Sequence, residues 1–231
     1  HWVGHSLGGM IALAFAQGPM SGQLKSVTAI GSPCQLDLSP AVDLLCRASW
    51  LLGWLSELPV GFLSQMAAPW YHWIPFDPVA VRLANVSAGR VRRAMSNVLS
   101  DMPMTLTRQL AKIQINGGAV VSARDDRDFT AGLSRIERPL LCIAGSDDRV
   151  APPANARMAV DKAVSARTRW VLIGGQDTIP GYGHGDLLIG DRAPEHVFVH
   201  VGQWLLDSAD DDGLCNAHSA RADVAQTRQA G

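Results

Sequence analysis

Hydrophobic positions along the chain follow two alternating patterns, separated by a long region of a different kind. Short runs rich in apolar and β-branched residues predict strands over residues 2–4, 26–30, 139–144 and 169–173. Longer apolar stretches predict helices over 10–17, from Pro152 to about 163, and from Pro194 onward. In the last helix the residues on one face are Val197, Val201, Trp204 and Leu205. Strands that alternate with helices predict an α/β fold, with a mostly parallel sheet covered on both faces.

Residues 39–135 interrupt the alternation with a region of helical periodicity. Four of the seven tryptophans lie here: Trp50, Trp54, Trp70 and Trp73. Apolar residues recur at helical spacing in three groups, which include Leu44 to Leu55, Val91 to Leu99, and Leu106 to Ile113. We expect a helical insertion of about four helices between two parts of a core, 1–38 and 136–207. Residues 208–231 lack periodicity and are rich in Ala, Asp and Arg, which predicts a disordered tail.

Composition and charge argue against several classes of partner and site. The 231 residues are enough for one domain, and 20 basic side chains nearly balance 21 acidic ones. This balance gives no reason to expect nucleic acid or an anionic membrane as a partner. No apolar run reaches the eighteen or so residues of a spanning helix. The cysteines form no C-x-x-C pair and have no zinc-type spacing, so we expect reduced structural cysteines, no metal, and a cytoplasmic location.

The most specific motif is Gly4-His5-Ser6-Leu7-Gly8, which fits the pattern G-x-S-x-G between a predicted strand and a predicted helix. A serine on such a sharp strand-to-helix turn has strained backbone angles. Positions 4 and 8 are expected to approach each other there, so that only small residues fit. The helix would direct its N-terminal end at the reacting oxygen, with the backbone N–H of Leu7 as a donor to an oxyanion. Gly9 would permit close packing of that helix.

This motif resembles the nucleophile elbow of lipases and esterases of the α/β-hydrolase superfamily, and the resemblance extends over residues 2–206. It implies the C-terminal part of such a fold, with a cap or lid at 39–135. The resemblance also implies several strands and a second oxyanion donor before His1. We therefore expect the 231-residue chain by itself to be poorly soluble and nearly inactive.

In the resembling family the nucleophile is followed along the chain by an acid and then by a histidine. Residues 145–152, Gly-Ser-Asp-Asp-Arg-Val-Ala-Pro, are similar to the acid loop of that family, and their register selects Asp148. Asp147 is its neighbour and would face elsewhere. Asp37 follows an earlier strand, where a minority of related lipases have their acid, and it remains an alternative.

The base is expected in the loop after the last strand, where glycines flank His184 on both sides. Among the other histidines, His72, His196, His200 and His218 do not follow a strand in this way. His5 adjoins the nucleophile, but the turn would direct it into the scaffold. For Asp186, two residues after His184, we expect a capping role in the loop.

The resulting hypothesis is a serine hydrolase that cleaves a small-molecule carboxylic ester through an acyl-enzyme, without a cofactor. The Trp, Leu and Met content of the insertion favours a substrate with an apolar acyl or alkyl part. An acyltransferase, or a polyester depolymerase or synthase, would use the same triad and remains an alternative, as does a non-catalytic module. Ser6 argues against dehalogenases and epoxide hydrolases of this fold, which use aspartate. The oligomeric state stays open.

Overall fold

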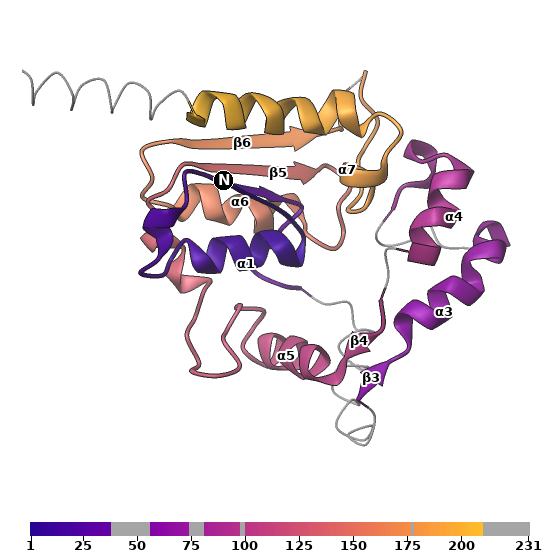
Figure 1. The fold of residues 1–231 in the computed structure, drawn as a ribbon, viewed down its shortest axis with the longest axis horizontal. Coiled ribbons are helices and arrows are strands. Elements are labelled where there is room, and N and C mark those ends of the chain that lie inside the picture. Colours follow the sequence, from indigo (N-terminus) through magenta and orange to yellow (C-terminus); the bar gives the residue numbers. More distant parts are fainter. Residues whose placement is uncertain (38–55, 74–80, 98–99, 177, 210–231) are drawn as a thin grey trace, which may run out of the picture.

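The computed structural model describes residues 1–37, 56–73, 81–97, 100–176 and 178–209. A parallel four-stranded sheet, in the order β1-β2-β5-β6, lies at the centre of this part of the chain (Figure 1). Its strands are β1 (Trp2–His5), β2 (Val27–Ile30), β5 (Leu140–Gly145) and β6 (Thr168–Ile173). The carboxyl ends of all four strands therefore meet at one edge. The sheet confirms the predicted α/β class.

The two inner strands, β2 and β5, are buried along their whole length, as expected of strands covered on both faces. Successive side chains of a strand point to opposite faces. One apolar cluster combines Val27, Ala29, Leu140 and Cys142 with helices α1 (Leu7–Phe15) and α6 (Pro153–Lys162). The opposite cluster combines Ile30, Leu141 and Ile143 with α7 (Asp186–Ile189) and the last helix. Helices thus cover both faces.

Two helix boundaries differ from the sequence prediction. Helix α1 begins at Leu7 rather than Met10, because the Ser6 carbonyl already accepts the N–H groups of Gly9 and Met10. The last helix opens with a π-helical turn (Pro194–Phe198) and continues as α-helix to residue 209. Residues 208 and 209, expected in the tail, are therefore helical, and Ser208 is buried. The rest of the expected tail lies outside the described residues.

The inserted region is partly described and contains more than helices. Its elements are β3 (Glu57–Leu58), α3 (Val60–Ala67), η2 (Ala68–Trp73), η3 (Leu83–Asn85), α4 (Ala88–Asn97), β4 (Met102–Pro103), α5 (Met104–Ile115) and η4 (Ala131–Arg135). Strands β3 and β4 form a two-residue antiparallel pair that the sequence did not predict, because so short a pair has no hydrophobic alternation to read. The helix expected around 44–55, with Trp50 and Trp54, lies outside the described residues.

Two of the four cysteines, Cys34 and Cys142, are free and buried. Burial raises the pKa of the Cys34 thiol to about 12, so that side chain is neutral and packs as a small apolar residue. This agrees with the structural role expected for it. Cys46 and Cys215 lie outside the described residues. Within the described ranges, none of the helices combines the length and the apolar character needed to traverse a lipid bilayer.

Candidate active site

Ser6 occupies the turn between β1 and α1, at the carboxyl edge of the sheet. Its backbone has φ 53° and ψ −120°, a conformation that non-glycine residues rarely adopt. The Ser6 N–H donates to the Ile30 carbonyl at 2.9 Å, which fixes the turn to the neighbouring strand β2. Leu7 is the first residue of α1, where backbone N–H groups have no partner within the helix. The turn therefore combines a strained serine with an N–H group available to an anion.

Two glycines of the motif have no room for a side chain. A Cβ atom on Gly4 would collide with the backbone of Gly8 and Gly9, and one on Gly9 would collide with Ser32 and the Gly4 carbonyl. These contacts allow α1 to approach the sheet closely. Positions 4 and 8 approach each other as expected, but the expected need for a small residue at position 8 was wrong, because a Cβ there would meet nothing within 4 Å. Gly8 contributes its backbone to the contact with Gly4, and its own Cβ position faces open space.

Asp148 and His184 are hydrogen-bonded to each other across the same edge, with 2.8 Å between Asp148 Oδ2 and His184 Nδ1. Both are buried, Asp148 being 3% and His184 7% exposed. The other carboxylate oxygen of Asp148 accepts the N–H groups of Val150 (2.9 Å) and Ala151 (2.7 Å), which orient the carboxylate. A carboxylate can only accept, so Nδ1 of His184 donates and its Nε2 remains free to take a proton.

The alternative acids and bases lie elsewhere. Asp147 pairs with Arg82 at 2.8 Å, and Asp37 is exposed. His196 Nδ1 lies 2.9 Å from the Tyr182 hydroxyl, and His200 lies in the last helix. His72 falls in η2, and His218 lies outside the described residues. No group of three or more His, Cys, Asp or Glu side chains in the described ranges is arranged to hold a metal ion.

The surroundings of His184 bring it to the Ser6 turn. The His184 ring lies 4.6 Å, centroid to centroid, from the ring of His5, which directly precedes Ser6. Gly31, at the end of β2 with φ +52°, faces the pair: a Cβ there would lie 3.3 Å from both Asp148 Oδ2 and His184 Nδ1. Within the described part of the chain, no hydrogen bond joins Ser6 Oγ to His184. In structures without substrate, catalytic hydrogen bonds are often long and close only when substrate binds.

His5 has a larger role than its position in the motif suggested. Its Nε2 lies 3.0 Å from the His184 carbonyl oxygen and therefore donates to it. Burial, with a smaller contribution from the nearby His184, lowers the pKa of His5 to about 4. His5 is thus a neutral hydrogen-bond donor at ordinary pH. It fixes the backbone of the loop that contains His184, called here the histidine loop, to the Ser6 turn. No sequence pattern indicates this bond, which joins residues 179 positions apart.

We expect His5 to make folding stability pH-dependent. Its folded pKa of about 4 lies below the ordinary 6.5, so the unfolded chain binds the extra proton first. The contribution is complete above pH 6.5 and is lost as the pH falls through 4, to a total of about 3 kcal/mol. His5→Gln, which retains a donor but does not titrate, should flatten the fall. Urea unfolding of both proteins from pH 7.5 to 4 measures this, and equal slopes would contradict it.

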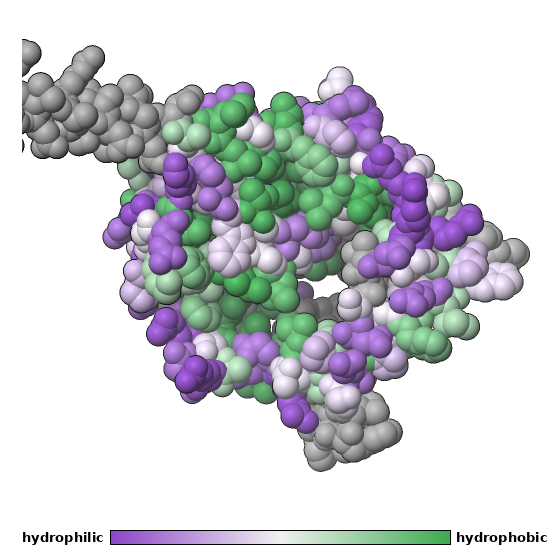
Figure 2. All heavy atoms as spheres, viewed as in Figure 1, coloured by the Kyte–Doolittle hydropathy of each residue, from purple (hydrophilic) through white to green (hydrophobic). Residues whose placement is uncertain are grey.

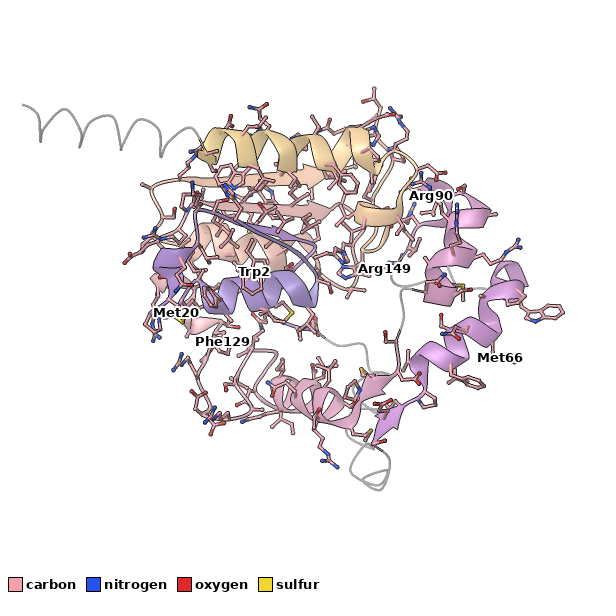
Figure 3. The ribbon with its side chains drawn as sticks, viewed as in Figure 1. Trp2, Met20, Met66, Arg90, Phe129 and Arg149 are labelled. Carbon is pink, nitrogen blue, oxygen red and sulfur yellow. The ribbon has the colours of Figure 1, made fainter. Side chains whose placement is uncertain are left out.

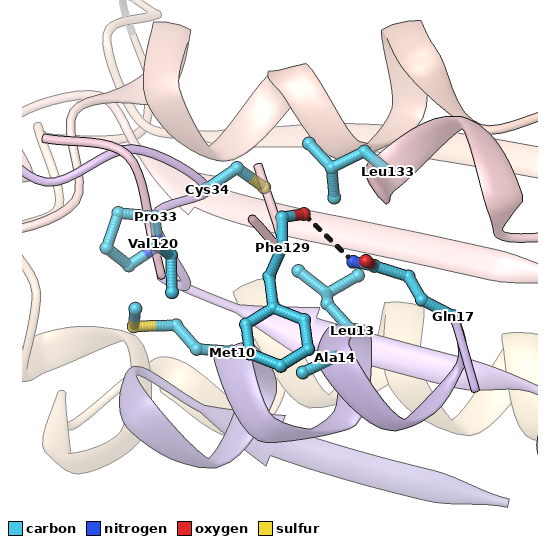
Figure 4. Close-up of a pocket in the computed structure, with 9 residues that line it drawn as sticks. All are labelled: Met10, Leu13, Ala14, Gln17, Pro33, Cys34, Val120, Phe129 and Leu133. Atoms are coloured by element: carbon cyan, nitrogen blue, oxygen red, sulfur yellow. Dashed lines mark hydrogen bonds between the residues drawn. The ribbon is translucent and has the colours of Figure 1, made fainter. Parts of the chain in front are cut away.

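An apolar cavity of about 460 Å³ opens beside Ser6. This is a common size for a small-molecule pocket. Its wall comes from α1, from α5 and from residues 120–129, including Ile11, Leu106, Leu110, Ile113, Val121 and Phe129. Figure 3 labels Phe129 below α1, in the segment that follows α5. Phe129 also lines a smaller cavity with Met10 and Leu13, where its carbonyl accepts a hydrogen bond from Gln17 Nε2 at 3.0 Å (Figure 4).

The insertion contributes to this cavity through α5 and through residues 120–129. Leu106, Leu110 and Ile113 of α5 line it, with Val121 and Phe129. Trp70 is 63% exposed and does not line it. The expected apolar wall is therefore formed by Leu, Ile, Val and Phe side chains among the described residues.

The chain belongs to the alpha/beta hydrolase family, whose model matches residues 1–201. No curated protein matches the chain in sequence. Its fold is similar to that of an esterase from Thermogutta terrifontis (TM-score 0.58, 18% identity, 89% of this chain and 64% of that one). It is also similar to that of a monoacylglycerol lipase from Paleococcus ferrophilus (TM-score 0.57, 16% identity, 89% of this chain and 67% of that one). An enol-lactonase from Burkholderia xenovorans has a similar fold too (TM-score 0.51, 18% identity, 88% of this chain and 64% of that one). At these identities the likeness shows the fold, and the chain spans about two thirds of each of these structures.

Proposed function

We propose that the protein is a serine hydrolase that cleaves carboxylic esters with an apolar acyl part, using Ser6, His184 and Asp148 as its triad. The observation that carries the proposal is the buried Asp148–His184 hydrogen bond, at the same sheet edge as the strained Ser6 turn. The apolar cavity beside Ser6 supports the choice of substrate. The similar solved structures include an esterase and a monoacylglycerol lipase.

In this mechanism His184 Nε2 takes the hydroxyl proton of Ser6 while Ser6 Oγ bonds to the ester carbonyl carbon. The carbonyl electron pair moves onto its oxygen, and the Leu7 N–H stabilises that oxyanion. Collapse of the intermediate expels the alcohol, which takes the proton from His184. Water then repeats the sequence on the acyl-enzyme and releases the acid. Asp148 stays ionised and stabilises the imidazolium form of His184.

A covalent label tests the nucleophile. A fluorophosphonate probe should attach to Ser6 of the folded protein, and Ser6→Ala should remove both the label and the hydrolysis of p-nitrophenyl butyrate. Labelling of wild type at another residue, or esterase activity that persists in Ser6→Ala, would refute the proposal. Product analysis in water with an added alcohol separates hydrolysis from acyl transfer, because an acyltransferase would give mainly the new ester.

A further inference from the structure

Asp186, two residues after His184, is fully buried and does more than cap a loop. Its Oδ1 accepts the backbone N–H of Arg82 at 3.2 Å. Its Oδ2 accepts the backbone N–H of Gly183 at 2.9 Å and the side-chain amide of Asn85 at 2.6 Å. One buried carboxylate thus joins the residue before His184 to two residues of the insertion.

Asn85 contacts the histidine loop on both sides of His184. Besides its bond to Asp186, its Nδ2 donates to the Gly181 carbonyl at 2.7 Å. Its own carbonyl accepts the N–H of Asp191 at 2.9 Å. The side chain and backbone of Asn85 therefore reach positions 181, 186 and 191, which lie before α7, at its first residue and after it. This is an extensive set of bonds between segments about a hundred residues apart in sequence.

The hydrogen bonds of the buried Asp186 carboxylate contribute more to stability than the exposed ion pairs near them. Arg90 pairs with Asp191 at 3.2 Å, but both side chains are more than 40% exposed, and exposed pairs contribute little. Figure 3 shows Arg90 where α4 comes close to the α7 region, and Figure 2 shows hydrophilic residues gathered along this junction. A buried carboxylate, by contrast, is costly to leave without its donors. The bonds of Asp186 therefore tie the two segments together more strongly than the exposed pairs do.

The loop also touches the insertion directly. A Cβ on Gly183 would lie 3.3 Å from Arg82 Cγ and 3.4 Å from Arg82 N, so the two backbones are in close approach. A shift of residues 82–85 would press on Gly183, which is bonded covalently to His184. Catalysis is sensitive to such shifts, since a displacement of about 1 Å can cost on the order of a hundredfold.

We propose that Asn85 and Asp186 form a clamp through which the helical insertion sets the position of His184. Asn85 is then a positioning residue for the base, acting through Asp186, and the inference rests on the proposed function of His184. The clamp couples residues 82–85 of the insertion to the group that takes the proton.

The first test compares Asn85→Ala with a control in the same segment. Ser87→Ala is the control, because among the described residues the partner of the Ser87 hydroxyl is the exposed Asp191 carboxylate at 3.1 Å, seven residues from His184. With p-nitrophenyl butyrate, Asn85→Ala should lower kcat about tenfold with KM changed less than threefold, because the base is displaced while the apolar cavity is intact. Ser87→Ala should stay within twofold in both constants. Equal kcat values for Asn85→Ala and wild type would overturn the inference.

A spectroscopic readout separates positioning from a general loss of stability. The low-field proton NMR signal of His184 Nδ1–H, bonded to Asp148, should weaken or broaden in folded Asn85→Ala and remain in Ser87→Ala. A signal as sharp in Asn85→Ala as in wild type would also overturn the inference.

Hydrogen exchange of the wild-type protein tests the clamp without any substitution. The N–H groups of Arg82 and Gly183 share the Asp186 carboxylate, so they should exchange at similar rates, as one opening unit. Rapid exchange at Arg82 beside slow exchange at Gly183 would overturn the clamp. If Ser6 is labelled in wild type, these results decide the clamp alone. If Ser6 is not labelled, the proposed function fails, and the role of His184 on which the clamp depends fails with it.

Discussion

Replacing Asp148 by asparagine is expected to lower kcat by a factor on the order of 10⁴ while the protein remains folded. An amide of the same shape can present its NH₂ group to His184 Nδ1, which reverses the donor and acceptor roles of that bond. Nε2 of His184 would then carry the proton and could not take one from Ser6. The bonds from Val150 and Ala151 to Oδ1 can persist, so the fold should be preserved. Steady-state kinetics with p-nitrophenyl butyrate measures the effect.

The matched control for this substitution is Asp147→Asn, at the adjacent position. Asp147 pairs with Arg82, and about a third of its side chain is exposed, so the lost ion pair should cost little. We expect kcat within about fivefold of wild type. A loss in Asp147→Asn as large as the loss in Asp148→Asn would contradict the assignment of the acid. So would an Asp148→Asn variant that retains most of its activity.

Filling the apolar cavity should change which esters the protein hydrolyses. Leu110 lines the cavity from α5, and Leu110→Trp would occupy space that we assign to the acyl chain. Each methylene kept out of the cavity loses about 0.8 kcal/mol, so excluding three costs about 2.4 kcal/mol. We expect kcat/KM for p-nitrophenyl octanoate to fall by a factor of about 60, and that for the acetate ester to change less than threefold.

A control for this experiment lies on the same helix. Ile115 is 72% exposed and does not line the cavity, so Ile115→Trp adds the same ring to α5 without filling it. Ile115→Trp should leave the ratio of octanoate to acetate hydrolysis unchanged. Parallel losses on both esters in Leu110→Trp would show that the cavity is not the acyl site.

The fold could be predicted from the sequence because the patterns that indicate its strands and helices are local. Strand β5 is a continuous apolar run, β2 is apolar apart from Thr28, and Pro153 stands in the first turn of α6, where proline is favoured. The first residue of α1 could not be predicted in this way. The sequence shows an apolar stretch from Met10, whereas the helix begins where the Ser6 carbonyl accepts its first bonds.

Contacts between segments far apart in the sequence could not be predicted in this way. Asp186 was expected to cap its own loop, yet its partners include Arg82 and Asn85 of the insertion. His5 was expected to point into the scaffold, yet it donates to the His184 carbonyl. Neither bond leaves a periodic pattern in the sequence, because hydrogen bonds across a fold need only one suitable group at each end.

The sequence by itself determined the class of fold and predicted the candidate triad at positions 6, 148 and 184. Both follow from chain order and local turn chemistry. Only the tertiary structure decided which further groups hold His184: the ring of His5 and the bonds of Asp186. It also decided which inserted helix lines the cavity. The physical reason is that packing and buried hydrogen bonds depend on the positions of segments in space, which the local pattern of residues does not encode.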